Sequence, residues 1–227
     1  MSNLIRLELK RFSLRSHVQG VVIANFIILA LSVTTSFSSS QLVVPGLPSF
    51  RLETIDIAKM LVIATFIVWE AVLIAIIIIE EFRSKTISLL YTYPVNRKEL
   101  IATKLFLICS VTLAFIIFSE IFQYISIYIL SRIFSIVTFH FYYADLFNVT
   151  ITVISAILLG LLPMYIGMIR KSTIATILSS LAVVTIAANS QGSTAGLISI
   201  PIVAVVFGLI GLIFAGIAIK NITTSDL

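Results

Sequence analysis

Long runs of apolar residues, separated by short polar stretches, dominate the pattern of this chain. A membrane-spanning helix needs about 20 mainly apolar residues, and each of the runs is close to that length, the fifth being the shortest. The pattern therefore predicts an all-α membrane protein with one transmembrane domain over residues 1–227. The six predicted spans cover about residues 18–37, 60–79, 105–130, 146–169, 173–188 and 198–219.

The composition excludes the other broad classes of protein. Hydrophobic residues make up 59% of the chain and charged residues 11%, against about 45–50% and 25% in soluble domains. A soluble protein of this size cannot bury so much apolar surface, and disordered chains are polar and rich in charge. The single cysteine, Cys109, excludes a disulfide scaffold and is expected to be a small buried apolar residue.

The basic residues indicate how the spans are oriented in the plasma membrane. If the N-terminus is cytoplasmic, twelve Lys and Arg fall in the inner segments and three fall outside. This bias places both termini in the cytoplasm. The net charge of +5 is thus explained by residues that flank the spans, and no nucleic acid is expected as a partner. The inner segments are 1–17, 80–104, 170–171 and 220–227, and the outer basic residues are Arg51, Lys59 and Arg132.

An interfacial helix is expected before the first span. Ile5, Leu9 and Phe12 recur at helical spacing within residues 2–16, and basic residues stand between them. A cleaved signal peptide is the less favoured interpretation, because no Ala-x-Ala type site closes the first apolar run.

The segment between the second and third spans carries a pattern of its own. Glu81 stands four residues before Lys85, which is a favourable spacing for an ion pair on a helix. Pro94 ends that helix, because the residue before a proline leaves the α-helical region. The sequence therefore predicts a short helix over residues 83–94, whose apolar face is formed by Ile87, Leu90 and Tyr91.

The next helix is predicted to begin at Arg97. Asn96 is a favourable N-cap residue, and Glu99 follows it three residues later. From the residues alone, the short helix before it has two interpretations. It is an interfacial anchor with basic side chains over the headgroups, or it is a docking element for a soluble partner.

This segment resembles the cytoplasmic loop that follows the second span of ABC-2 type transporter permeases. Lys85 stands where many members have glycine, and the Glu-Phe-Arg-x-Lys-Thr-Ile form is most similar to small Gram-positive permeases for antimicrobial-peptide export and immunity or for secretion of amphipathic peptide toxins. The residues that carry the resemblance are Glu81, Arg83, Thr86, Leu89, Leu90, Pro94, Val95 and Arg97.

The resemblance implies the permease subunit of an ATP-driven exporter. In that family the short helix is a coupling helix, which seats in a cleft of an ATP-binding cassette subunit. Two six-span halves, identical or related, then surround a path for an amphipathic or hydrophobic peptide. The chain has no G-x-x-x-x-G-K-[ST] sequence, so ATP and Mg are expected on the partner ATPase, and no catalytic residue is expected here. The implied docking residues are Arg83, Lys85, Thr86, Ile87, Leu90, Tyr91 and Pro94.

Glu70 is the first candidate for a substrate path. It lies ten residues before the inner end of the second span, about 15 Å into the membrane. A carboxyl group there is costly and marks a candidate functional site. Three interpretations stay open: a neutral group hydrogen-bonded between helices, a polar lining of the path, and a proton relay. A small-residue face lies close to it, formed by Ala64, Ala71 and Ala75.

Glu120 is the second candidate and belongs to a polar stripe on the third span. Hydrogen bonding between helices is the favoured interpretation of this stripe, and Glu120 and Gln123 are also candidates for the path. An alternative function uses Glu70 and Glu120 in a proton-coupled carrier or channel, which needs no ATPase. No inverted repeat supports that alternative. The rest of the stripe consists of Thr112, Ser119 and Ser126.

Two further features concern packing. Pro163 is expected to kink the fourth span. The last span carries small residues at spacings of four and three, which permit close approach of a neighbouring helix. No metal site is expected, because His17 and His140 fall at opposite ends of the membrane. The small residues are Ala204, Gly208, Gly211, Ala215 and Ala218.

Overall fold

The regular secondary structure is helical throughout the residues that the structure describes, as the sequence predicts. This computed structural model describes residues 14–41, 53–83, 97–134, 137, 143–189 and 196–224. The helices, with η1 a π-helix and η2 a 3₁₀-helix, are α2 (Leu14–Gln41), α3 (Thr54–Ile74), η1 (Ala75–Ile79), α4 (Glu80–Arg83), α6 (Arg97–Ile133), α7 (Tyr143–Gly160), α8 (Leu162–Arg170), α9 (Thr173–Ala187), η2 (Leu197–Ser199) and α10 (Pro201–Thr224).

Within the described residues, five helical segments are long and apolar enough to cross a membrane. The sixth apolar helix, α9, has 15 residues and a rise of about 22 Å, which is less than the 30 Å or so of a bilayer core. The prediction of membrane-spanning helices is therefore confirmed for five runs, and the fifth predicted run forms a shorter helix. The five segments are Ser16–Phe37, Thr54–Arg83, Leu100–Ile133, Leu146–Arg170 and Pro201–Asn221.

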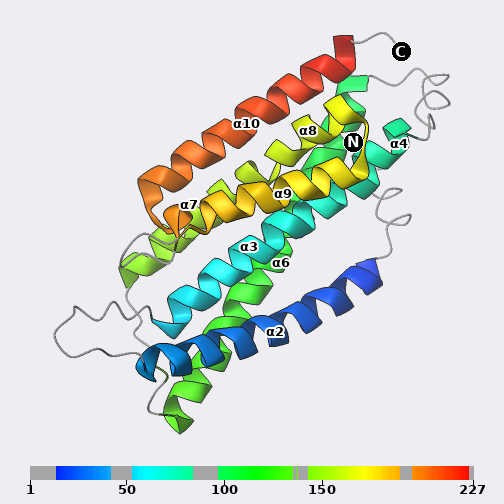
Figure 1. Cartoon of the computed structure of the whole chain (residues 1–227). Coiled ribbons are helices and arrows are strands. Elements are labelled where there is room, and N and C mark those ends of the chain that lie inside the picture. The colour runs from blue at the N-terminus through cyan, green and yellow to red at the C-terminus, as the bar shows by residue number, and fades with distance from the viewer. Residues whose placement is uncertain are drawn as a thin grey trace.

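Helix α3 lies at the centre of the bundle. It packs against α2 and α6 on one side and against α7 and α9 on the other, while α10 packs outside along α7 (Figure 1). In its apolar window 67% of the residues are buried, against 28% in α2 and in α10. The rest of the bundle is thus assembled around α3.

One end of the bundle gathers most of the inner segments that the charge pattern predicts. The start of α2, the end of α4, the start of α6, the α8–α9 turn and the end of α10 all lie there (Figure 1). Helix α6 begins at Arg97, as predicted from Asn96 and Pro94. The interfacial helix over residues 2–16 and the short helix over 83–94 lie outside the described residues, except for their terminal residues 14–16 and Arg83.

The predicted kink at Pro163 is confirmed as a break between α7 and α8. Helix α7 ends at Gly160 and α8 begins at Leu162, with Pro163 in its first turn. Leu161 bridges the break with 3₁₀-type bonds: its N–H donates to Leu158 O over 3.3 Å, and its carbonyl accepts from Met164 N over 3.1 Å. Because proline has no N–H, the regular α-helical ladder cannot continue through this point.

The small residues of α10 form the contact with α7, as predicted. A Cβ added to Gly208 would lie 3.1 Å from the Cα of Ser155, and a Cβ on Gly211 would overlap the carbonyl group of Leu158. The two backbones therefore approach closely only because glycine occupies these positions. The whole seam is buried, namely Ala204, Gly208, Gly211, Ala215 and Ala218.

We predict that Gly211→Ala lowers the free energy of unfolding by about 1–3 kcal/mol, because the added methyl group overpacks the α7–α10 contact. The matched control is Gly216→Ala on the same helix, where an added Cβ meets no atom of the described residues within 4 Å. Denaturation of both purified variants in detergent measures the difference. Equal stabilities of the two variants would contradict the packing described.

Candidate functional site

The carboxyl group of Glu70 lies in the last turns of α3, near the middle of the continuous helical segment Thr54–Arg83, and is enclosed by protein. The residue is 0% exposed, and neither carboxyl oxygen has a hydrogen-bond partner among the described residues. The group packs against the backbone of Gly160 at the end of α7, where an added Cβ would lie 2.7 Å from the Glu70 carboxyl carbon. Glu70 therefore faces a helix seam, and the glycine makes room for it.

Other polar groups near this depth also lack partners among the described residues. They are the Trp69 indole nitrogen and the hydroxyl of Thr112 on α6, and both atoms are buried. Unpaired polar atoms in an apolar interior cost free energy. The hydrogen bond between helices that one interpretation of Glu70 requires is thus not made to any described residue. Its roles as path lining or as proton relay stay proposals.

Glu120 lies in a different polar cluster, in the second half of α6. Its carboxyl oxygens are buried and have no hydrogen-bond partner among the described residues, but Lys59 of α3 attracts it electrostatically. The Lys59 ammonium itself bonds Asp56 over 3.3 Å and lies 5.5 Å from the centre of the Tyr124 ring. This cluster brings three ionisable side chains together near the start of α3.

The structure does not bring the two candidate carboxyl groups together. Lys59, which accompanies Glu120, stands eleven residues before Glu70 on α3, which corresponds to about 16 Å along the helix. The Glu70 side chain contacts α7, whereas the Glu120 side chain of α6 lies near Lys59 in the first turns of α3. A direct exchange of a proton between the two groups is therefore not possible in this arrangement.

Gln123 takes part in a buried network between α2 and α6. Its Nε2 donates to the backbone oxygen of Asn25 over 2.9 Å and to Asn25 Oδ1 over 3.3 Å. Asn25 Nδ2 in turn donates to Ser119 Oγ over 2.8 Å. Hydrogen bonding between helices is therefore confirmed for Ser119 and Gln123. Sequence reasoning missed Asn25, although an amide side chain this far inside the first apolar run was a visible signal.

At the end of α4, the structure describes one of the seven implied docking residues. Arg83 is exposed and lies 3.6 Å from Glu80 in an ion pair. Such exposed pairs contribute little to stability. The other implied docking residues lie outside the described residues: Lys85, Thr86, Ile87, Leu90, Tyr91 and Pro94.

Glu81 forms a buried ion pair that the sequence did not predict. It was expected to pair with Lys85, which lies outside the described residues, and it is found bonded to the Lys104 ammonium of α6. Both side chains are almost fully buried. The Lys104 ammonium also donates to the Ile77 carbonyl over 3.4 Å. The signal in the sequence was Lys104 itself, a lysine whose neighbours along the chain are mostly apolar.

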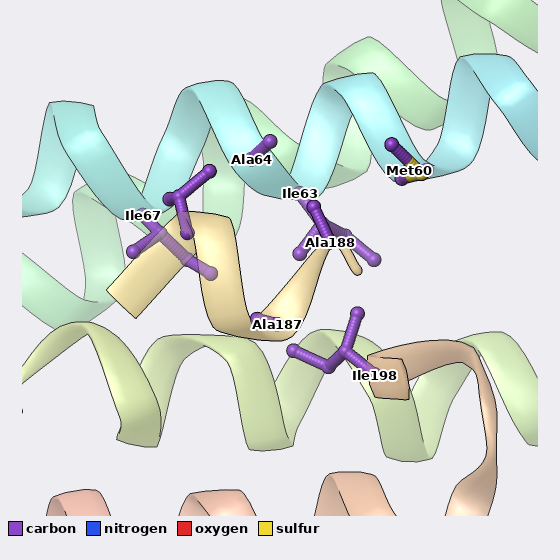
Figure 2. Close-up of a pocket in the computed structure, with 8 residues that line it drawn as sticks. Met60, Ile63, Ala64, Ile67, Ala187, Ala188 and Ile198 are labelled. Carbon is purple, nitrogen blue, oxygen red and sulfur yellow. The ribbon is translucent and has the colours of Figure 1, made fainter. Parts of the chain in front are cut away.

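A small apolar pocket lies between α3, the end of α9 and η2 (Figure 2). It is a shallow gap between side chains that does not enclose the space of a water molecule. It offers no polar side chain to a ligand, and no group of three or more metal-ligating side chains occurs among the residues described. The pocket is lined by Met60, Ile63, Ala64, Ile67, Val184, Ala187, Ala188 and Ile198.

We predict that Gly160→Ala destabilises the protein by about 1–3 kcal/mol, because the added methyl group overlaps the Glu70 carboxyl group. The penalty should fall by at least half in a Glu70→Ala background, where the obstructing side chain is shortened. Unfolding of the four proteins of this double-mutant cycle in detergent gives the coupling. Additive effects would show that the two residues are not in contact.

Comparison with known proteins identifies a relative of the same length. The chain is 32% identical over 232 residues to the uncharacterized protein YcbO of Bacillus subtilis (strain 168), and the match covers 99% of both chains. No protein-family model matches the chain, and no solved structure matches it. At this identity and coverage, the chain belongs to the same protein family as YcbO of Bacillus subtilis.

Proposed function

We propose that this chain is the membrane-spanning permease subunit of an ATP-driven exporter of the ABC-2 type. The ATPase is a separate subunit, which binds ATP and Mg and contacts the segment between α4 and α6. A second copy of the chain, or a related permease, completes the path through the membrane. The substrate is an amphipathic or hydrophobic peptide.

One observation carries this proposal. The segment over residues 84–96, whose sequence resembles a coupling helix, is joined directly to the central helix through α4 and η1. Helix α3 packs on α2, α6, α7, α8 and α9. A displacement of this segment by a partner would therefore act first on the helix that contacts most of the bundle.

The charge distribution supports a cytoplasmic position for that end of the bundle. The described basic residues there outnumber those at the opposite end, where Lys59 and Arg132 lie. Basic residues favour the cytoplasmic side of a membrane. Both termini and the docking segment then face the ATPase. The basic residues at this end are Arg15, Arg83, Arg97, Lys98, Lys104, Arg170, Lys171 and Lys220.

The proposed path follows the side of α3 that the bundle leaves partly exposed. Helix α3 lies between α2 and α9 in Figure 1, and α9 does not reach the length of a full span. The resemblance places the first, second and fifth spans beside the path. An apolar lining suits an apolar or amphipathic peptide better than a hydrophilic solute. The partly exposed residues recur on one face, namely Leu61, Thr65, Val68, Val72 and Ile76.

We predict that the double variant Leu90→Ala/Tyr91→Ala weakens binding of the ATPase by about 2–4 kcal/mol, because anchors buried in a partner cleft carry most of the binding energy. Lys85→Ala should have a smaller effect, because a charge at the rim of an interface stays solvated. Co-purification of the two subunits at several protein concentrations measures both effects. Undiminished assembly of the double variant would return this segment to the role of a membrane-surface anchor.

A proton-coupled carrier is the second candidate, and it is favoured by the carboxyl groups of Glu70 and Glu120, which have no hydrogen-bond partner among the described residues. Glu70→Gln keeps the shape of the side chain and removes its titratable proton. We predict that this variant still assembles with the ATPase and still exports peptide when ATP is supplied to vesicles without a proton gradient. Loss of transport in Glu70→Gln with intact assembly and ATP hydrolysis would favour the carrier or a relay role. Expulsion of an antimicrobial peptide for immunity moves the peptide in the same direction as secretion, so the proposed exporter covers both roles.

A further inference from the structure

The π-turn in the central helix decides which neighbour Glu81 faces. Glu70 and Glu81 are eleven residues apart, so a regular α-helix would place them within about 20° of each other around its axis. The π-helix over Ala75–Ile79 lies between them. One such turn adds about one residue to the helical ladder and rotates the following residues by about 100°. Glu70 consequently contacts Gly160 of α7, whereas Glu81 bonds Lys104 of α6.

Lys104 holds this turn at two points. Its ammonium forms the ion pair with Glu81 and also donates to the carbonyl of Ile77 inside the π-helix. Carbonyl groups in a π-turn lose their regular α-helical donors, and inserted side chains commonly occupy them. Removing one partner of a buried ion pair is strongly destabilising, because the interaction that offset the burial of the other charge is lost.

The opposite side of the π-turn contacts the α8–α9 hairpin. Ile79 is fully buried, and its Cδ1 lies 3.2 Å from the position of a Cβ added to Gly167 of α8. A Cβ added to Gly167 would also overlap the Thr176 side chain of α9, so the two helices are in close contact at this glycine. A change of register in the π-turn would therefore press on the hairpin and on α9, the short helix beside the proposed path.

We infer that Glu81 and Lys104 are positioning residues for energy coupling, which hold the π-turn of the central helix in one register until residues 84–96 are displaced. The two residues of the pair flank that segment in the sequence. Glu81 stands two residues before the end of α4, and Lys104 stands seven residues after the start of α6. Breaking the pair frees the turn to return to α-helix, which rotates Glu81 away from α6 and moves Ile79 against α9. This inference rests on the proposed function only for its link to ATP.

The first test needs no ATPase. Hydrogen exchange of the purified chain in detergent is compared for the wild type, Lys104→Met, Glu81→Gln and the control Glu80→Gln, whose exposed pair with Arg83 adjoins Glu81. We expect amides 75–83 to exchange about tenfold faster or more in the first two variants, and to be unchanged in the control. Equal exchange in all four proteins would show that the Glu81–Lys104 pair does not hold the π-turn.

Deletion of Ile76 tests the register directly, because it removes one residue of the π-turn at an exposed position. The deletion should restore a regular helix in which Glu81, now ten residues after Glu70, still faces α6. With no π-turn left to release, Lys104→Met should add little further change in exchange. Ile76→Ala is the matched control and should behave as the wild type. If Lys104→Met still accelerates exchange tenfold in the deletion variant, the pair does not act by holding the π-turn.

The second test measures coupling in vesicles that contain the ATPase. Lys104→Met should lower peptide exported per ATP hydrolysed about tenfold or more, while co-purification of the ATPase stays at the wild-type level. The exchanged pair Glu81→Lys/Lys104→Glu, or Lys104→Arg, should recover most of the coupling. Wild-type coupling in Lys104→Met, or no recovery in either rescue variant, would overturn the positioning role. The exchange results stand apart from this, so a failure of the wild-type chain to bind any ATPase would refute the proposed function alone.

Discussion

The enclosure of the central helix depends on glycine residues in its neighbours. Trp69 and Glu70 are consecutive on α3, and each is accommodated by a glycine on a different helix. A Cβ on Gly20 of α2 would lie 2.5 Å from the Trp69 ring, and a Cβ on Gly160 of α7 would overlap the Glu70 carboxyl group. Large or polar side chains can therefore sit inside the bundle because the facing backbones carry none. With α3 held in this way, the remaining helices pack around it.

This arrangement gives the two ends of α3 different surroundings. Near its start, Lys59 lies in a polar cluster with Asp56 and Glu120. Beyond its end, the chain passes through the π-turn and the Glu81–Lys104 pair toward the segment that resembles a coupling helix. The buried part between them, with Glu70, is closely packed, and close-packed interiors deform little. An exporter driven by a cytoplasmic partner would use such a connection.

The sequence predicted the features that depend on local chemistry. Composition predicts the long apolar helices, and capping predicts the start of α6 at Arg97. The missing N–H of proline predicts the break at Pro163, and residue spacing predicts the small-residue seam of α10. Contacts between helices were predicted less well. When apolar residues cover every face, the pattern does not fix the rotation of a helix about its axis. Asn25 as the partner of Gln123 was missed for that reason.

The end of α3 shows the same restriction more sharply. Nothing in a run of isoleucines signals the π-turn that precedes Glu81 or the bond of Glu81 to Lys104, whereas the pairing of Glu81 with Lys85 stays a prediction. The short length of α9 was visible in its sequence, but its place against α3 and α8 depends on the whole bundle.

Peptide export by sealed vesicles that contain this chain and its partner ATPase, with the proton gradient abolished, tests the central claim most directly. Uptake of an amphipathic peptide into inverted vesicles should follow ATP hydrolysis and should stop when the ATPase carries a substitution that blocks hydrolysis. Transport that continues without ATP and follows an imposed proton gradient would contradict an ATP-driven exporter.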